Sequence, residues 1–417
     1  MTRYAKAPAV KRNYAPREFF LTGLYGIIFI YAAFFSFLRP LGAELLILVI
    51  GSTLTIFTLI NAKFFDLRLL IFAAVAAVYA LLSLTVDLHS EATALYSPAA
   101  IPQQVAYALI LFFLVPAFAH FLHMLRQDNR LFLLLEKFVL AICVISIIWT
   151  ELILQRPSIP TFAIGTLTNV HVLVLFILYR NISVFTKTFM RWGFFAALIV
   201  PAVAASLQTL IATFYYLLFL IAGRWRLAVL GGSLVLLILA IIAALMFPTE
   251  LYELDANSGV RSWMWHAVIE RVAVTGGVGV GFGTELVPPY LVHEGGRFVL
   301  RVQTEGSFLH IGAHNAFFDV YYRMGIIGVG IFLAYIGQKI HFVVRHRRYF
   351  DAFDYWAIFT LVLTLMVNVA LVSFNFIFGT CMLLGWLTMR EAEIRKQRAA
   401  ARPAGITSSQ NVNEREG

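Results

Sequence analysis

Apolar segments long enough to cross a bilayer recur along the chain, and they limit the possible fold more than any other feature. A membrane-spanning helix needs about 20 apolar residues, and six segments meet this requirement: 19–38, 41–60, 69–86, 105–122, 138–154 and 161–179. Hydrophobic residues make up 61% of the chain and charged residues 13%, against about 45–50% and about 25% in soluble domains. The sequence predicts an all-α polytopic membrane protein.

Basic residues between these segments predict how the chain is oriented. Short cytoplasmic loops are enriched in Lys and Arg. The intervals 61–68, 123–137 and 180–191 each carry such residues, whereas 87–104 has none and contains two acids. The N-terminus is therefore expected in the cytoplasm. The net charge of +10 follows from this orientation, and no nucleic-acid partner is predicted because the basic residues do not gather on one face.

The apolar stretch 192–222 decides the number of spans. It is too long for one tilted helix, and Pro201, Ser206 and Gln208 interrupt it. Counting it as two spans, 192–205 and 207–222, puts every later basic cluster on the cytoplasmic side. With further spans at 227–247 and 315–338 and a helical hairpin at 353–389, the prediction is about twelve helices.

The predicted organisation has five parts. They are a basic cytoplasmic N-terminus (1–18), nine spans (19–247), one large extracytoplasmic loop (248–314), three spans (315–389) and a basic tail that becomes disordered (390–417). Between residues 248 and 313 the chain has seven acids and four arginines. This excess of acid agrees with an extracytoplasmic loop.

Arg261 is the first candidate site residue in the loop. Helical spacing predicts a short amphipathic helix over 260–274, capped from Asn257, Ser258 or Gly259, with Arg261 in its first turn. The N-terminus of a helix is already positive, so the arginine and the helix together predict an anion site. A solvated arginine at the membrane interface is an equally consistent interpretation.

Glycines and tryptophans beside Arg261 have two interpretations each. The run 276–283 could bind phosphate through backbone N–H groups, although a flexible link between helix and loop is favoured. Trp263 and Trp265 could stack on a sugar ring, but tryptophans are also common at membrane interfaces.

His314 is the candidate general base. It precedes Asn315, the expected cap of the next helix, and an imidazole at a helix N-terminus is biased toward its neutral form. Asp319 is the alternative base, and a histidine without a role is also consistent. His310 lies four residues before His314, but the chain has no H-E-x-x-H motif and zinc would need another ligand, so no metal site is predicted.

Three motifs together resemble the signature of the O-antigen ligase and O-antigen polymerase superfamily. They are S-G-V-R-x-x-x-W from residue 258, a glycine run ending G-V-G-F-G, and A-H-N-x-F-F ahead of R-M-G-I-I-G. Members of that superfamily are bacterial inner-membrane enzymes with about a dozen helices and one large periplasmic loop before the third helix from the end. The motifs cover about 70 residues, and the architecture covers almost the whole chain.

The resemblance implies transfer of a glycan from an undecaprenyl-diphosphate-linked donor to lipid A-core or to a growing glycan, without a cofactor or required metal. It also implies a fold similar to that of lipid-dependent C-type glycosyltransferases. Arg261 would bind the diphosphate, and His314 would take the proton from the acceptor hydroxyl. Trp263, Trp265 and Asn315 are possible glycan contacts.

The chain departs from the family pattern at one point. Members usually carry a serine–arginine pair after the central helical break, where this chain has Ser206-Leu207-Gln208-Thr209. Arg156, Arg271 or Arg297 would then supply the second phosphate contact, or the chain belongs to a divergent branch.

Two other classes of function remain open at the level of sequence. A transporter or flippase of lipid-linked glycans is one of them, although no internal repeat is found and the polar residues gather in one loop outside the bilayer. His171 lies within a predicted span, where an ionisable residue indicates a function or an interhelical hydrogen bond. A non-catalytic scaffold for envelope assembly is the third candidate, and it would tolerate loss of Arg261 and His314.

Overall fold

A computed structural model of the chain describes residues 64–85, 96–127, 207–284, 289–294, 297–302, 312–367 and 374–400, with a few positions before residue 57. This part of the chain is nearly all helical. Its helices are α4 (Leu67–Thr85), α5 (Ile101–Gln127), α9 (Leu207–Ile221), α10 (Arg226–Met246), α11 (Pro248–Leu254), α12 (Ala256–Val274), α13 (Ala316–Arg345), α14 (Ala352–Val367) and α15 (Phe374–Ala400).

Four of these helices are long and apolar enough to cross a membrane. Their candidate spans are Leu67–Thr85, Pro98–Arg126, Gly223–Met246 and Ala316–Arg345, and α14 is a shorter apolar helix. They coincide with segments that the sequence predicts as spans. The predicted spans 138–154, 161–179 and 192–205, and most of 19–38 and 41–60, lie outside the described residues. Twelve spans therefore stays a prediction.

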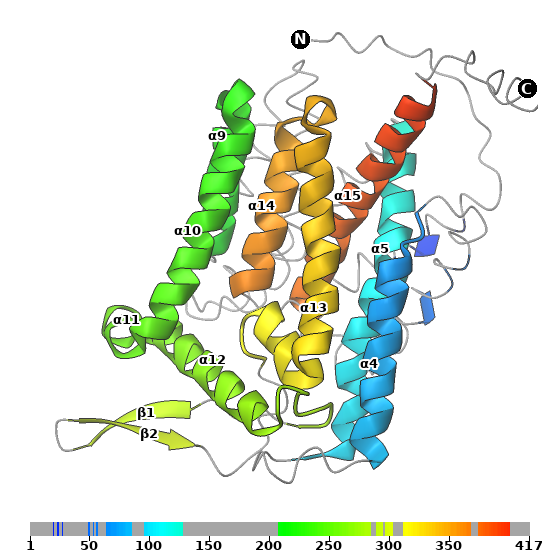
Figure 1. The fold of residues 1–417 in the computed structure, drawn as a ribbon. Helices are drawn as coiled ribbons and strands as arrows, with labels where there is room; N and C mark the ends of the chain where they lie inside the picture. Colours follow the sequence, from blue (N-terminus) through cyan, green and yellow to red (C-terminus); the bar gives the residue numbers. More distant parts are fainter. Residues whose placement is uncertain are drawn as a thin grey trace, which may run out of the picture.

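The helices pack side by side into a bundle, with α14 behind α13 and between α9 and α15 (Figure 1). Every residue of α14 from Ala352 to Met366 is buried, as expected for a helix that is apolar on all sides. Tyr215 of α9 stacks on Phe359 of α14 with ring centroids 3.8 Å apart. In contrast, only Leu230 and Ser233 of α10 are buried, so the outer surface of α10 is suited to contact lipid.

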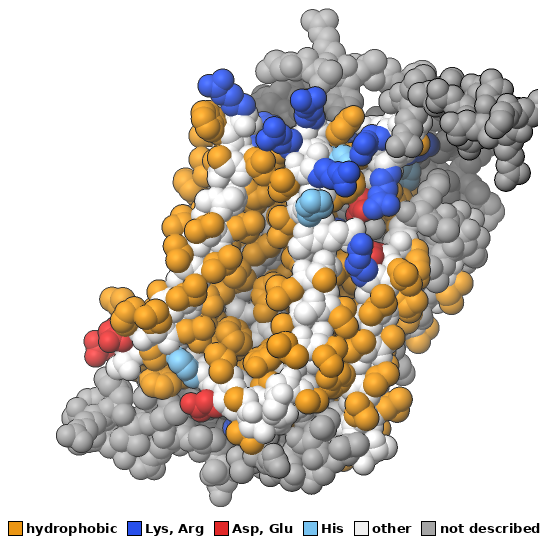
Figure 2. Space-filling view, viewed as in Figure 1, with side chains coloured by type: hydrophobic (Ala, Val, Ile, Leu, Met, Phe, Trp, Pro, Cys, Tyr) orange, Lys and Arg blue, Asp and Glu red, His pale blue; other side chains and the backbone are white. Residues whose placement is uncertain are grey.

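The two ends of the bundle differ in charge. At one end lie the start of α10 and the ends of α13 and α15, and at the other lie α11, α12 and the small sheet (Figure 1). Lys and Arg side chains gather at the first end (Figure 2).

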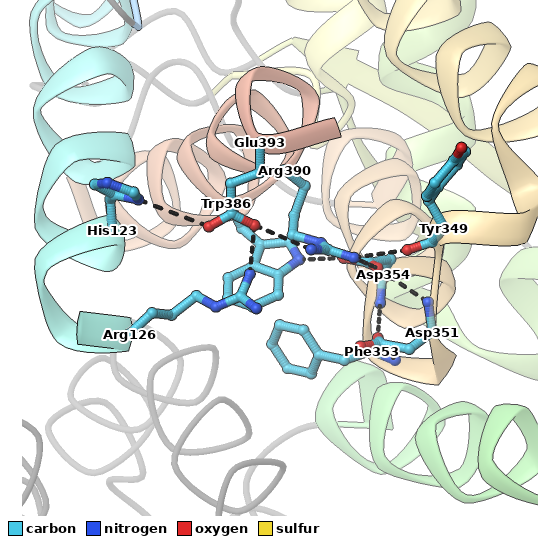
Figure 3. Close-up of polar contacts among 9 residues, drawn as sticks. All are labelled: His123, Arg126, Tyr349, Asp351, Phe353, Asp354, Trp386, Arg390 and Glu393. Carbon is cyan, nitrogen blue, oxygen red and sulfur yellow. Dashed lines mark hydrogen bonds and ion pairs between the residues drawn. The ribbon is translucent and has the colours of Figure 1, made fainter. Parts of the chain in front are cut away.

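A buried ion network joins α5, α14 and α15 at the basic end (Figure 3). The Asp354 carboxylate is fully buried and accepts from Trp386 Nε1 at 2.8 Å and from Arg390 Nε at 3.1 Å. Glu393 accepts from Arg126 at 2.6 Å and from Arg390 at 3.0 Å. Buried charges are tolerated only when they are paired and hydrogen-bonded, so this network holds the three helices in one register.

A glycine-rich turn, defined here as residues 275–284, packs against a break in α13. Gly325 interrupts the helix with φ 57° and ψ −155°. The turn pairs the backbone groups that this break leaves without partners, because Val280 N–H donates to Tyr322 O at 2.7 Å and Gly281 N–H donates to Arg323 O at 3.1 Å. A Cβ at Gly279 would lie 2.5 Å from Gly325 N.

All backbone N–H groups from 276 to 283 donate within the protein, and the acceptors outside the turn include Ser83 Oγ and Gln104 Oε1, both at 2.7 Å. No N–H of this run is left to bind phosphate, so the predicted phosphate cradle is wrong. The favoured interpretation as a flexible link is also wrong, because the turn is bonded to α4, α5 and α13. It acts as a junction between helices.

A short antiparallel sheet lies beyond this turn and departs from the all-α prediction. Strand β1 (Pro289–Glu294) pairs with β2 (Arg297–Val302), with Glu294 opposite Arg297. Gly295 and Gly296 separate the strands, and a two-residue Gly-Gly loop favours a hairpin.

We expect Gly279→Ala to destabilise the protein strongly. Gly279 has φ +99° and no room for a Cβ, so the substitution combines backbone strain of about 1–3 kcal/mol with displacement of α13. Gly231→Ala in α10 is the matched control because its Cβ would meet nothing. Thermal unfolding in detergent should show a large drop for Gly279→Ala and none for the control, and equal melting temperatures would contradict the role of the turn.

Candidate active site

Arg261 lies in the second turn of α12, not in its first turn as the sequence predicts. The helix begins at Ala256, and Asp255 adopts the extended backbone of a capping residue. Its carboxylate accepts from the Ser258 N–H at 3.1 Å. Asp255 therefore caps the helix in place of the predicted Asn257, Ser258 or Gly259, and the positive helix end and the guanidinium are separate features.

Two hydrogen bonds fix the first half of α12 against the end of α10. The Ser262 hydroxyl donates to Ala244 O at 2.5 Å, and His266 Nε2 lies 2.7 Å from Leu245 O. Both partners are backbone carbonyls in the last turn of α10, where the helix itself leaves carbonyls without acceptor bonds. The backbone that carries Arg261 is thus held against α10 by bonds one and five residues after that position.

The guanidinium of Arg261 has an N–H donor that no described residue accepts from. Its Nη1 donates to Val367 O at the end of α14 at 3.1 Å, while its buried Nε has no hydrogen-bond partner among the described residues. Burial lowers the pKa of Arg261, and the nearby Asp255 charge acts in the opposite direction. Arg261 remains charged, because an arginine stays protonated in proteins. A partly buried cation with an unused hydrogen-bond donor is suited to bind an anionic ligand.

Two hydrogen bonds to the backbone of the preceding residue, Ala313, hold His314 in place. Ala313 N–H donates to Asp319 Oδ1 at 2.5 Å, and Ala313 O accepts from Trp265 Nε1 at 2.6 Å. The residue after His314 is fixed as well, since the Asn315 side chain accepts from the N–H groups of Phe317 and Phe318 and caps α13. His314 itself has φ 53°, a left-handed conformation that costs energy for a residue with a Cβ and that these bonds maintain.

The environment of His314 keeps its imidazole neutral. Burial, and after it the positive charge of Arg261, lower the pKa of His314 to about 4. The two residues therefore lie close enough to interact electrostatically. A neutral imidazole can accept a proton, whereas the guanidinium beside it can stabilise negative charge.

Trp265 and Asp319 both support the site through the backbone of Ala313. Trp265 is 6% exposed and stacks on Phe318 with centroids 5.5 Å apart, which leaves no ring face for a sugar. Asp319 is 6% exposed and binds the Ala313 backbone through Oδ1, so it positions His314. Its buried Oδ2 has no hydrogen-bond partner among the described residues, so its role as the alternative base stays a prediction.

The remaining predicted residues lie in different surroundings. Trp263 is half-buried, and its indole N–H has no partner among the described residues. Arg271 lies ten positions after Arg261 on α12, about 15 Å along the axis, and donates to Tyr322 Oη at 3.3 Å. Arg297 begins β2. The structure does not bring Arg271 to Arg261, and Arg156, His171 and His310 lie outside the described residues.

An apolar groove of about 460 Å³ lies between α10, α13 and α14, and Asn315, the residue after His314, is part of its lining. Its lining residues are almost all apolar, and Asn315, the neighbour of His314, is its main polar one. They include Leu234, Ile238, Phe317, Leu333, Ile340 and Met366. Because α10 packs loosely against the bundle, the groove offers a hydrocarbon-lined path along the helices to the position of His314.

Sequence reasoning missed the residues that hold the junction together. Arg323 Nη1 donates to Thr284 Oγ1 at 2.9 Å and also to the Thr284 carbonyl. Gln104 Nε2 donates to the same carbonyl at 3.4 Å. The available signal was the arginine of the R-M-G-I-I-G motif, which is a buried structural cation next to the break in α13.

No group of three or more His, Cys, Asp or Glu that could hold a metal ion occurs among the residues that the structure describes. Comparison with protein-family models, with curated proteins and with solved structures finds no match to the chain. The likeness to the O-antigen ligase and polymerase superfamily therefore stays a resemblance of motifs, and a functional assignment depends on the residues and their geometry.

We expect His314 to titrate near pH 4, about two units below an ordinary histidine. The folded protein then binds fewer protons than the unfolded chain between about pH 4 and about pH 6.5, so this residue makes the folded state less stable as the pH falls through that range. Imidazole NMR signals, assigned by their loss in His314→Asn, would measure the pKa. The variant should also gain stability relative to the native protein at pH 5 compared with pH 8.

Proposed function

We propose that this protein is a glycosyltransferase of the bacterial inner membrane. It transfers a glycan from an undecaprenyl-diphosphate-linked donor to an acceptor hydroxyl at the periplasmic face, as an O-antigen ligase or as a polymerase of O-antigen or exopolysaccharide. The observation that carries the proposal is the buried His314, which bonds at Ala313 and Asn315 hold in place, together with the charge of Arg261, which contributes to lowering the pKa of that histidine.

The chemistry of transfer matches this pair. The acceptor oxygen attacks the anomeric carbon, the bond from that carbon to the diphosphate oxygen breaks, and the acceptor proton moves to His314. Negative charge builds up on the departing diphosphate. A fixed guanidinium stabilises that charge more strongly in the transition state than in the ground state, which is the condition for acceleration.

The basicity of His314 should increase when the donor binds. Arg261 contributes to lowering the pKa in the free protein, so an anion bound at Arg261 offsets this effect and makes the imidazole more basic. His314 would then become an effective base only with a donor diphosphate in place. This order limits proton loss from an acceptor or from water when no donor is present.

The apolar groove supports a donor with a long hydrocarbon tail. Its lining includes Asn315, and it lies between helices that are suited to a bilayer. A polyprenyl chain along α10 and α13 would bring its diphosphate toward Arg261, while the sugar would extend away from the bundle toward the side of α11 and α12. Trp263, with an unused indole N–H, is the remaining candidate for a sugar contact.

Substitution of either residue should greatly reduce glycan transfer, while the amount of protein in the membrane stays normal. We expect Arg261→Gln to lower the rate of glycan transfer by about 10²- to 10³-fold and His314→Asn by about 10²- to 10⁴-fold. The matched controls, Arg224→Gln and His341→Asn, remove the same residue types from the opposite end and should retain activity. Surface polysaccharide of normal length and amount in both site variants would contradict the enzymatic function.

A strain in which the gene is deleted separates a ligase from a polymerase. In cells that lack the protein, a ligase leaves long glycans on undecaprenyl diphosphate, whereas a polymerase leaves single repeat units.

Addition of inorganic pyrophosphate to the purified protein should raise the pKa of His314, and this shift should be absent in Arg261→Gln.

The proposal requires α11 and α12 to face the periplasm. A cysteine introduced at the exposed Glu250 of α11 should react with a membrane-impermeant maleimide in cells with a permeabilised outer membrane. A cysteine at the exposed Arg224 should react only after the inner membrane is opened. Labelling in the reverse order would exclude the proposed function, because donor glycans ready for assembly lie on the periplasmic side.

A further inference from the structure

A pocket of about 430 Å³ lies at the basic end of the bundle, where α13 turns back into α14. Four arginines, one histidine and one tyrosine line it: Arg345, His346, Arg347, Arg348, Tyr349 and Arg398. We refer to it as the arginine pocket. No acidic side chain is among its lining residues in the part of the chain that the structure describes.

The described acids near this pocket already have partners, and the Asp351 carboxylate accepts from the N–H groups of Phe353 and Asp354 at the start of α14. Asp66 and Glu391 bind Lys339 at 3.1 and 3.0 Å, and Glu391 also binds Arg395 at 2.5 Å. Asp354 and Glu393 bind Arg390 in the ion network described above (Figure 3).

The arginine pocket therefore carries uncompensated charge. Within the described part of the chain, Arg345, Arg347 and Arg348 form no ion pair. Like charges held this close repel one another, and an anion from outside the protein would remove that cost.

Hydrogen bonds hold the walls of the pocket in place. His346 Nδ1 lies 3.0 Å from Phe342 O and acts as the donor, so its Nε2 accepts from Arg398 Nη1 at 2.6 Å. Tyr349 O accepts from Arg390 Nη2 at 2.8 Å, which ties the short helix Arg347–Tyr349 to the ion network. The arginines thus project from a fixed turn and need little reordering to bind a ligand.

An apolar side chain is exposed next to the pocket. Val344 is 41% exposed and directly precedes Arg345, and both belong to a helix that is long and apolar enough to cross a membrane. Lys and Arg gather at this same end of the molecule (Figure 2). A ligand with a phosphate group attached to acyl chains would meet both features at once.

We propose that the arginine pocket binds the phosphate headgroup of an anionic phospholipid from the surrounding bilayer. Arginines fix the phosphate through charge-assisted hydrogen bonds, and the acyl chains lie along the outer face of α13 beside Val344. Basic pockets between helices at the cytoplasmic side are suited to such headgroups. The inference does not depend on the proposed transferase activity, because the site lies at the end of the bundle away from Arg261 and His314.

The test compares lipid retention by two triple variants of the full chain. The first, Arg345→Gln/Arg347→Gln/Arg348→Gln, removes three cations from the pocket. The second, Arg68→Gln/Arg224→Gln/Lys396→Gln, removes three exposed cations that do not line it. Each purified protein in neutral detergent is titrated with phosphatidylglycerol or phosphatidylcholine, and bound lipid is counted by native mass spectrometry. Melting temperatures without lipid check that both variants are folded.

We expect the native protein and the second variant to retain phosphatidylglycerol in preference to phosphatidylcholine. The pocket variant should bind it at least about tenfold more weakly, since each basic residue near an anionic surface contributes about fivefold. Equal loss of retention in both variants would overturn the site, because it would indicate general attraction by net charge. Full displacement of the lipid by millimolar inorganic phosphate would overturn the assignment to a lipid and indicate a soluble anion.

Discussion

The structure depends on pairing the backbone groups that become free where α13 breaks at Gly325. In a bilayer an unpaired peptide group costs several kcal/mol, so a broken helix is tolerated only when another segment supplies partners. The glycine-rich turn supplies them through Val280, Gly281 and Gly277. It can approach so closely because both sides of the contact are glycine. Through Ser83, Gln104 and Arg323 the same turn also bonds to α4, α5 and α13.

The candidate active site follows from that junction. Once α12 and α13 are held at the turn, Trp265 and Asp319 meet at the Ala313 backbone, and His314 is fixed beside Arg261. Burial then gives the two residues different protonation states. It leaves the imidazole neutral, because a histidine loses its proton at modest cost, and it leaves the guanidinium charged, because an arginine does not. The same buried environment therefore provides a neutral base, His314, and a charged group that can bind an anion, Arg261.

Arginines at the other end of the bundle show how partners decide the role of a residue type. Arg390 is buried between Asp354 and Glu393 and holds helices together. Arg345, Arg347 and Arg348 are exposed at the turn after α13 without a described acidic partner, and they are available to a ligand. Arg323, inside the junction, is satisfied by neutral acceptors of Thr284. Sequence composition treats all of them alike as positive charge.

The sequence by itself determined the class of protein, the positions of the described spans, Asn315 as the cap of α13, and Arg261 and His314 as the residues to examine. These follow from local rules of apolar length, charge and capping, which operate over a few residues. Only the tertiary structure decided that the glycines form a junction and not a cradle, that Trp265 and Asp319 position His314, that Arg271 lies apart from Arg261, and that a two-stranded sheet interrupts the helical pattern. The junction and the fixing of His314 are set by contacts between segments far apart in the chain, and a hydrogen bond from α12 to Ala313 or from the turn to α4 has no local signature, because either partner could equally well have been satisfied elsewhere.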